Sequence, residues 1–362
     1  MQSTKSIIAG AVGHGLKHAL MGIKNLFLRS ATESLRPTHI VYMVTDRCNS
    51  RCAHCNIWQK EPSKNPLTAQ EVKQALSDDL FKDVKYVLCT GGEPTVRSDL
   101  LDIIAGIHSA LPEACIQLST NGLLPHRVIE TATAAMNAGI SLDIGVSLDG
   151  IGKAHDKIRG VKGNFEKTDH LIHELVKLRD KHKDRLHIAA GIVLSELTLD
   201  NLPEVRSYVN ELGIELTEAW YNESSFYDNV GTNHFDDRLI EAVRSQPPSP
   251  LQELWLRAVE NRPIKFPCFA MYTFCVLKCD GDIVPCLNHF EKSAGNVRKQ
   301  SPTEIWHSLE MRNVRQTVKD CRGCLNSWGA GWSLSNSYYR HVLFYLKHPK
   351  LVIETLRMKE TP

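Results

Sequence analysis

Three cysteines, Cys48, Cys52 and Cys55, lie within the eight-residue segment CNSRCAHC. Cysteine thiolates bind zinc and iron–sulfur clusters. A structural zinc ion takes four ligands, so zinc here would need His54 or a distant cysteine as the fourth. Three thiolates instead bind three corners of a [4Fe–4S] cube and leave one iron open to an outside ligand. The spacing alone leaves both interpretations open.

A second motif, CTGGEPT at residues 89–95, follows an apolar run and ends in Pro94-Thr95. Because glycine has no Cβ, we expect Gly91 and Gly92 to let the backbone approach a ligand closely. We expect Glu93 to receive an ammonium group of that ligand. By itself the motif also fits an ordinary tight turn, but one βα unit after a Cys-x3-Cys-x2-Cys segment it is much more specific.

The elements that must position these motifs are indicated by alternating patterns. Apolar runs predict six strands, at 39–45, 85–90, 115–120, 141–149, 186–195 and 214–221. Helical periodicity predicts helices between them, including 68–79 with a Thr68/Glu71 capping box, 98–111 beginning at Ser98, and 164–182. Strands alternating with helices predict a parallel sheet covered by helices. In such folds the chemistry lies at the carboxyl ends of the strands, where both motifs fall.

With both motifs in place, the sequence resembles the radical S-adenosylmethionine (SAM) superfamily over roughly residues 38–330. The resemblance implies that Cys48, Cys52 and Cys55 hold three irons of a [4Fe–4S] cluster, while SAM chelates the fourth. STNG (119–122), SLDG (147–150), HDKIRG (155–160) and GIVL (191–194) match further segments of that family. The residues it assigns to SAM are Gly91, Gly92, Glu93, Pro94, Ser119, Thr120, Asn121, Ser147, Asp149, Arg159 and Val193.

The expected fold class is therefore α/β, a partial (βα)6 TIM-like barrel followed by a small cysteine-rich Twitch-like domain. The expected chemistry is reductive cleavage of SAM to a 5′-deoxyadenosyl radical, which removes a hydrogen atom from an unactivated C–H bond. The resemblance also implies a low-potential electron donor, such as a flavodoxin or a ferredoxin. No acid, base or hydrogen donor can be assigned; Glu218, Tyr221, Glu223 and Tyr227 are weak candidates near the last strand.

A second group of six cysteines lies between residues 268 and 324. Within it, KCDGDIVPC predicts a short hairpin turning at Asp280-Gly281. Four thiolates in two pairs suit zinc or an iron–sulfur cluster, and zinc is the commoner occupant. The spacing also resembles the auxiliary-cluster region called SPASM or Twitch. That resemblance implies a second [4Fe–4S] cluster, which relays an electron or staples the domain, held by Cys268, Cys286, Cys321 and Cys324, with Cys275 or Cys279 as replacements for Cys268.

The charge of the chain is concentrated at its ends. The whole chain carries 43 basic and 41 acidic residues, which gives no indication of nucleic-acid binding. Residues 1–36 carry five basic residues and one acidic, and residues 330–362 carry five and two. Apolar and basic residues at helical spacing in 6–29 and 338–357 predict either association with an anionic membrane surface or packing against the barrel. The sequence contains no run of 18 apolar residues, so it predicts no membrane span.

The expected organisation is an amphipathic basic extension (1–37), a radical SAM barrel (38–222), a bridging region (223–265), an auxiliary-cluster domain (266–330) and an amphipathic basic tail (331–362). Eleven cysteines without a signal-peptide pattern favour a cytoplasmic protein, peripheral on the inner membrane face if the ends bind lipid. The leading hypothesis for the substrate is a lipid, a lipid-linked sugar or another cell-envelope precursor. The alternatives are an enzyme that modifies a peptide or oxidises a small sugar or aminocyclitol, and a non-enzymatic iron–sulfur electron-transfer protein.

Overall fold

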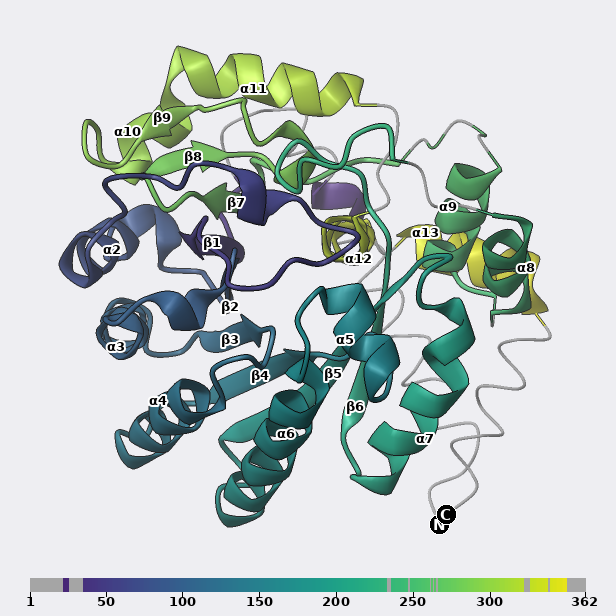
Figure 1. Cartoon of the computed structure of the whole chain (residues 1–362). Helices are drawn as coiled ribbons and strands as arrows, with labels where there is room; N and C mark the ends of the chain where they lie inside the picture. Colours follow the sequence, from purple (N-terminus) through teal and green to yellow (C-terminus); the bar gives the residue numbers. More distant parts are fainter. Residues whose placement is uncertain are drawn as a thin grey trace, which may run out of the picture. The chain divides into compact units, whose positions relative to one another are not determined.

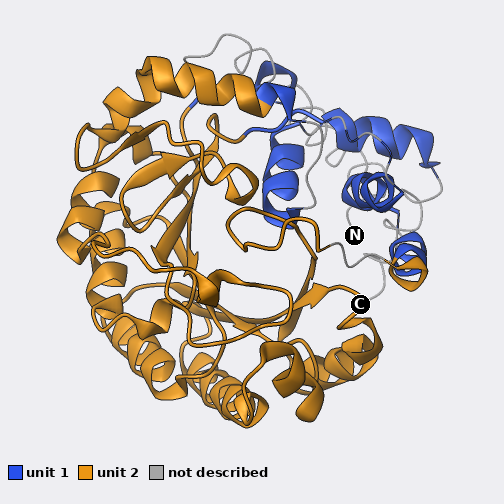
Figure 2. Ribbon diagram, turned by 45° about the horizontal axis from the view of Figure 1, so that its top comes forward, with its two compact units in different colours: residues 1–35, 240–269, 319–362 blue, residues 36–239, 270–318 orange. Residues whose placement is uncertain are grey.

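The chain forms two compact units (Figure 2). A computed structural model describes residues 22–25, 35–232, 236–246, 248–260, 262, 264, 266–321, 326–337 and 339–349. The barrel unit comprises residues 36–239 and 270–318. The helical unit comprises residues 1–35, 240–269 and 319–362.

The barrel unit is built on one nine-stranded sheet, with the order β6-β5-β4-β3-β2-β1-β7-β8-β9. Neighbouring strands from β1 to β6 pair in parallel. This confirms the predicted partial barrel, whose sheet stays open between β6 and β9 among the described strands. The six strands are β1 (His39–Thr45), β2 (Tyr86–Gly91), β3 (Cys115–Thr120), β4 (Leu142–Ser147), β5 (Leu186–Leu194) and β6 (Glu215–Trp220).

Helices cover the outer face of the parallel strands (Figure 1). Alternate strand residues such as Ile116, Leu118, Ile144 and Val146 are fully buried beneath them, so the intervening residues face the barrel lumen. The α-helices that lie between β1 and β6 along the chain are α2 (Ala69–Leu76), α3 (Leu100–Ala110), α4 (Pro125–Asn137), α5 (Lys153–Arg159), α6 (Asn164–Lys181) and α7 (Leu202–Glu211).

The helix starts follow local side-chain chemistry. The predicted capping box of α2 is confirmed, since Thr68 Oγ1 accepts from the Glu71 amide and the Glu71 carboxylate accepts from the Thr68 amide. The prediction that Ser98 begins α3 was wrong, because Asp99 is the N-cap and the first helical residue is Leu100. Nε and Nη2 of Arg97 donate to the two oxygens of the Asp99 carboxylate, which makes no cap.

The cysteine-rich segment continues the same sheet. β7 (Phe274–Leu277) pairs in parallel with β1, and β8 (Asp282–Val284) and β9 (Gly295–Asn296) follow antiparallel. The predicted hairpin between β7 and β8 is confirmed, with Gly281 in its turn at φ +97°. α10 (Pro302–His307) and α11 (Leu309–Asp320) come next along the chain.

The helical unit contains α8 (Asp237–Ser245) from residue 240 onward, α9 (Pro250–Val259), α12 (Ser327–Asn336) and α13 (Tyr339–Lys347). α9 packs against α12 and α13, and Leu254, Ile264 and Leu334 form a small core. Of the predicted helix within 6–29, the structure describes only residues 22–25, which are helical. The part of the predicted tail after Pro349 lies outside the described residues. No helix in the described part of the chain is both long and apolar enough to cross a membrane.

Candidate active site

The loop after β1 carries the first three cysteines at the carboxyl edge of the sheet. Ser50 contacts two of their thiols, with its amide 3.5 Å from Cys48 Sγ and its hydroxyl 3.3 Å from Cys52 Sγ. The guanidinium of Arg159 lies 3.6 Å from Cys52 Sγ. Burial raises the pKa of the Cys48 thiol to about 11 and that of Cys55 to about 12. Metal binding at these thiols therefore requires the release of protons.

The two glycines of the second motif are needed by the chain's own backbone. A Cβ on Gly91, which has φ +137°, would lie 2.1 Å from the Thr45 carbonyl oxygen. A Cβ on Gly92 would lie 2.0 Å from the Arg47 carbonyl oxygen. The amides of Gly92 and Glu93 donate to the same two carbonyls, at 2.7 and 2.8 Å. The two glycines were expected to let the backbone approach a ligand closely. In the structure they let the backbone that leads into Cys48 approach closely instead.

Glu93 is buried and its carboxylate is occupied by the protein. Oε1 accepts from the amide and hydroxyl of Thr95 and from the hydroxyl of Thr120, at 3.2, 2.7 and 2.8 Å. Oε2 accepts from the Asn121 amide at 2.7 Å. Burial raises the pKa of Glu93, and these donors partly offset that effect. In this arrangement Glu93 joins the turn containing Pro94 to the end of β3, and its oxygens already have partners.

The STNG segment connects this network to the cysteine loop. The side-chain amide of Asn121 donates to Asn49 Oδ1 at 2.8 Å and lies 3.9 Å from Cys48 Sγ. The Thr120 hydroxyl accepts from the Gly122 amide, so it serves both Glu93 and the turn. Ser119 alternates with buried Leu118 and Thr120 and faces the lumen.

Asp149 and Arg159, which were assigned separately to SAM, form an ion pair with each other. Arg159 Nε lies 2.8 Å from Asp149 Oδ2, with the side chains 8% and 0% exposed. Asp149 Oδ1 also accepts from the Val193 amide at 3.0 Å. Burial alone would raise the pKa of Asp149, but the Arg159 charge and the Val193 amide hold it below its usual value. The pair keeps both charges ionised inside the protein.

Three residues of the HDKIRG segment, His155, Asp156 and Arg159, have structural partners. The buried His155 accepts the Asp149 amide on Nδ1 at 3.2 Å, and burial together with Arg159 lowers the pKa of His155 to about 4. The Asp156 carboxylate accepts from the amides of Gly163 and Phe165 at the start of α6. Gly160 lies against the cysteine loop, where a Cβ would be 2.2 Å from the Arg51 carbonyl oxygen.

The lumen beside these residues is lined by small side chains. Gly145, Gly191 and Ala219 occupy lumen-facing positions of β4, β5 and β6. An added Cβ at Gly191 would meet no atom within 4 Å. Ser147 pairs in register with Gly191 at the same level of the sheet. The carboxyl ends of β4 to β6 therefore leave room for a bound molecule.

The segment 218–229 supports the cysteine loop. The Asn56 amide donates to the Tyr227 carbonyl at 2.8 Å, and Asn229 donates to the His54 carbonyl at 3.2 Å. Asn229 also donates to the Tyr221 hydroxyl. Glu218 forms an ion pair with Arg206 of α7, at 2.7 Å, so this carboxylate lies on the helix-covered face. None of these contacts was indicated by the spacing of the sequence motifs.

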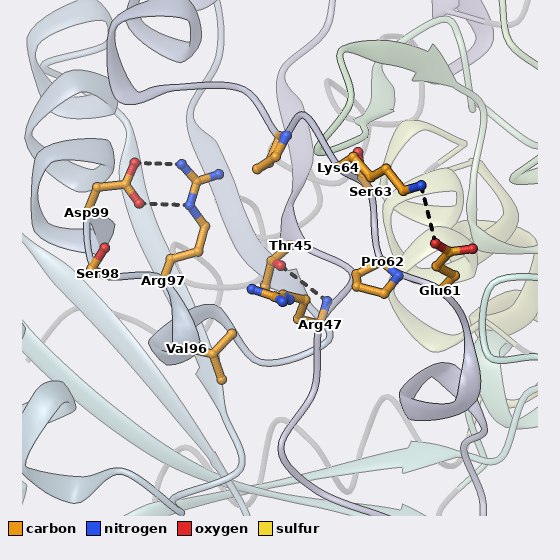
Figure 3. Close-up of a pocket in the computed structure, with 11 residues that line it drawn as sticks. Thr45, Arg47, Glu61, Pro62, Ser63, Lys64, Val96, Arg97, Ser98 and Asp99 are labelled. Atoms are coloured by element: carbon orange, nitrogen blue, oxygen red, sulfur yellow. Dashed lines mark hydrogen bonds and ion pairs between the residues drawn. The ribbon is translucent and has the colours of Figure 1, made fainter.

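A cavity of about 730 Å³ opens beside the loop that leads into Cys48 (Figure 3). Arg97 and Lys64, which line it, pair with Asp99 and Glu61. The guanidinium of Arg47 has no hydrogen-bond or ion-pair partner in the described part of the chain. The cavity walls come from the loop 61–66 and from residues 96–99 after β2.

The opposite, amino-terminal mouth of the barrel also carries charged residues. His187 lies between two carboxylates, 2.9 Å from Asp143 Oδ1 and 3.4 Å from Glu215 Oε2. The Tyr86 hydroxyl donates to Asp143 Oδ2 at 3.1 Å. His187 and Glu215 are 54% and 65% exposed, and a cavity of about 470 Å³ opens among these residues.

Comparison with known protein families matches two segments of the chain. The model of the radical SAM superfamily matches residues 42–199, which contain both motifs. The chain belongs to the radical SAM superfamily. The SPASM model, an iron–sulfur cluster-binding domain, matches residues 268–325. The protein is therefore a radical SAM enzyme with a [4Fe–4S] cluster that binds SAM and an auxiliary iron–sulfur region, and the non-enzymatic alternative is not supported.

Two curated relatives of this radical SAM enzyme come from Methanosarcina barkeri (strain Fusaro / DSM 804). Fe-coproporphyrin III synthase is 40% identical over 174 residues, which are 48% of this chain and 41% of the relative. AdoMet-dependent heme synthase is 23% identical over 317 residues, which are 79% and 87%. A solved structure of native anSMEcpe with bound AdoMet and a peptide matches with a TM-score of 0.57 at 14% identity, covering 88% of this chain and 99% of that one. At this identity the structural likeness shows the fold alone.

The residues of the radical SAM enzyme's first site fit a [4Fe–4S] cluster. One loop supplies the thiols of Cys48, Cys52 and Cys55, and the Arg159 guanidinium offsets negative charge at Cys52. Across the described residues, no three His, Cys, Asp or Glu side chains converge closely enough for a single metal ion. A cube instead takes each thiolate on a different iron, so its ligands spread around a larger group.

The cysteines assigned to the auxiliary cluster fall in different parts of the structure. Cys268 and Cys321 belong to the helical unit and Cys286 to the barrel unit, and Cys324 lies outside the described residues. Cys275 is fully buried in β7 opposite Ile40, where burial raises its thiol pKa to about 12. The grouping of four ligands stays a prediction.

Proposed function

We propose that this enzyme removes a hydrogen atom from an unactivated C–H bond of a molecule bound at the carboxyl ends of β4 to β6. The observation that carries the proposal is the open lumen at Gly191, at the same end of the sheet as the loop of Cys48, Cys52 and Cys55. When bound, the cluster and SAM supply the reductive bond cleavage that starts hydrogen abstraction. Exclusion of water by the surrounding walls would protect that chemistry.

The protein's own residues would hold and orient these groups. We propose the three cysteines as ligands and the backbone carbonyls around Gly91 and Gly92 as acceptors for the SAM ammonium, since the Glu93 oxygens already have four donors. Ser119 and Ser147 face the lumen and supply hydroxyls to the polar parts of SAM. Asp149, Arg159 and Val193 would act mainly through the shape of the site, because they bind one another.

Iron and sulfide content after anaerobic reconstitution, together with 5′-deoxyadenosine release under a strong reductant, tests this assignment. We expect about eight irons in the wild type if both clusters form. Replacing Cys48, Cys52 and Cys55 by alanine should remove about four irons and all deoxyadenosine. Replacing Cys321 and Cys324 should remove about four irons and leave some deoxyadenosine release. Full release by the first variant would contradict the site.

For the substrate class, we propose a lipid or lipid-linked sugar of the cell envelope. The support comes from α13, where Leu343 and Leu346 are 52% and 72% exposed and stand three residues apart on one face. Arg340 and Lys347 flank them on the same helix. Exposed aliphatic residues beside cations are typical of helices that lie in an anionic membrane interface.

Vesicle flotation tests this substrate class. The full chain should bind vesicles containing anionic lipid and not neutral ones, and Leu343→Ser/Leu346→Ser should lower the bound fraction severalfold. Leu101→Ser is the matched control, since Leu101 is a 37%-exposed leucine of α3 in the barrel unit. Equal binding by all three proteins, or none by the wild type, would overturn the lipid proposal while leaving hydrogen abstraction intact.

A tetrapyrrole is the second candidate substrate. Both curated relatives described above carry names of tetrapyrrole-forming enzymes, and one of them matches across 79% of this chain. Deoxyadenosine release should then increase with an iron porphyrin and not with a lipid extract. A peptide is the third candidate to add in the same assay, because the solved relative described above was bound to a peptide.

A further inference from the structure

The segment 221–229, which follows β6, contacts both groups of cysteines. On one side is the cysteine loop after β1. On the other is the short helix Leu287–His289, whose N-cap residue is Cys286. All three belong to the barrel unit. The segment is part of no helix or strand, so its backbone groups find their partners in side chains and neighbouring loops, and these contacts determine its shape.

Asn229 fastens the segment to the cysteine loop. Its side chain is buried, with the residue 3% exposed. The amide nitrogen donates to the carbonyls of His54 and Asn222, both at 3.2 Å, and to the Tyr221 hydroxyl at 2.9 Å. The amide oxygen accepts from the Ser224 amide at 2.8 Å. His54 directly precedes the third cysteine of the loop. Removal of the Asn229 side chain would leave several buried polar groups without a partner.

The other side of the segment is fastened to the turn after Cys286. Asn222 and Asn288 form a reciprocal pair, in which each amide nitrogen donates to the other amide oxygen at 3.2 Å. The Ser225 hydroxyl donates to the Glu291 carboxylate at 2.9 Å. Asn288 and Glu291 follow Cys286 by two and five residues. The contacts of the segment therefore reach close to a predicted ligand of each cluster.

The backbone of the segment has one strained residue, which both sides help to hold. Asp228 has φ +55°, a conformation that residues other than glycine seldom adopt and that persists only where the surroundings determine it. Its carbonyl accepts from the Asn56 side chain at 2.9 Å, and the Tyr227 carbonyl accepts from the Asn56 amide at 2.8 Å. On the other side the rings of Phe226 and Phe290 pack with their centres 4.9 Å apart.

We propose that Asn229 is a positioning residue for the loop of the SAM-binding cluster, and that Asn288 holds Asn229 in place from the turn after Cys286. Through Asn222 and Asn229, the position of that turn then influences the geometry of the cysteine loop. Hydrogen bonds around a cluster orient its ligands and tune its properties, so the influence extends to how tightly SAM binds. The proposal rests on the assignment of the first three cysteines to that cluster.

The affinity of the reconstituted holoenzyme for SAM tests the proposal. Its dissociation constant (Kd) is measured from the change that SAM causes in the electron paramagnetic resonance spectrum of the reduced protein, because SAM binds to the first cluster. The main variant is Asn288→Ala, at the far end of the connection from the cysteine loop. Asn229→Ala and the double variant complete a cycle. The matched control is Asn313→Ala, an exposed asparagine of α11 in the same unit.

We expect Asn288→Ala to raise the Kd for SAM about fivefold or more, with iron content unchanged, and Asn313→Ala to leave both unchanged. The double variant should bind SAM no more weakly than Asn229→Ala alone, because both substitutions interrupt one path. An unchanged Kd in Asn288→Ala would overturn the proposal. Losses that add in the double variant would also overturn it, since they would show two independent effects.

Hydrogen exchange of the full iron-free chain gives a second readout that needs no cofactor. In Asn288→Ala the amides of Ser224 and Asn56, which bond within and to the segment, should exchange about tenfold faster. The Ala53 amide is the internal control, because it donates to the Ile158 carbonyl on the other side of the loop. Equal acceleration at Ala53 would show general loosening and overturn the proposal. Failure of the wild type to bind SAM, with the expected exchange pattern, would count against the cluster assignment instead.

Discussion

The two ends of β4 carry carboxylates in opposite circumstances. Asp149, at the carboxyl end, is buried and paired with the buried Arg159. Asp143, at the amino end, pairs with a half-exposed His187 beside a solvent-exposed Glu215. A buried pair costs desolvation and is retained only where its geometry is well satisfied, whereas an exposed pair contributes little. The difference shows that the buried ion pair lies at the carboxyl end of β4, the end of the sheet that holds the cysteine loop.

The largest effect is expected from a substitution at Gly92, near the carboxyl ends of the strands, where the neighbouring backbone leaves no space for a side chain. Gly92→Ala would place a Cβ 2.0 Å from the Arg47 carbonyl, and backbone cannot yield as a flexible side chain can. We expect loss of about four irons on reconstitution. Gly331→Ala, in α12 with no atom within 4 Å of the added Cβ, is the control and should keep its iron. Full iron in Gly92→Ala would show that the loop tolerates a shift.

The next effect is the loss of the buried pair. Asp149→Ala leaves the Arg159 charge buried without its carboxylate and should lower the free energy of unfolding by about 3–5 kcal/mol. Chemical denaturation of the iron-free chain measures it. The double variant Asp149→Leu/Arg159→Met should recover most of the loss, since it leaves no unpaired charge. A loss below about 1 kcal/mol would mean that water already reaches the pair.

A smaller effect is expected in the dependence of folding stability on pH. Burial lowers the pKa of His155 from 6.5 to about 4, so between those pH values the unfolded chain binds a proton that the folded chain does not. Stability is therefore lost as pH falls through this window, by about 2 kcal/mol at pH 5 from this residue. His155→Gln should make the decline between pH 7.5 and pH 5 shallower by that amount. Parallel curves for the two proteins would refute the assignment.

The smallest effect is at the amino-terminal mouth. His187→Ala removes an exposed imidazole from Asp143 and Glu215 and should change the free energy of unfolding by no more than about 0.5 kcal/mol. The same denaturation assay applies. A loss above about 1.5 kcal/mol would erase the contrast between the two ends of β4.

The local pattern of the sequence predicts the six parallel strands and the α2 cap, because both depend on neighbouring residues. It also indicates the cysteine loop and the following turn. It does not indicate that Asp149 pairs with Arg159, since a charged residue in a motif looks the same whether its partner is a ligand or another side chain. The same limit applies to Glu93, whose oxygens bind Thr120 and Asn121 of a different strand end.

Longer-range features were beyond the sequence. The pairing of β7 with β1 joins residues that are more than 200 positions apart, and no local pattern specifies such a contact. The polar composition of residues 223–265 predicts only a bridging region. In the structure this region contains α8 and α9, and Leu254 of α9 helps to form the core of the helical unit.

The pairing of β7 with β1 also has a consequence for synthesis of the chain. Ile40, Val41 and Tyr42 are fully buried in the finished sheet, yet one edge of their strand has no partner until β7 has been translated. At about 5–20 residues per second the ribosome needs roughly 10–50 s to cover that interval. An unpaired apolar strand edge invites pairing with other chains. We expect nascent chains that end before residue 274 to aggregate or to bind chaperones, and those that extend past β9 to be released from them.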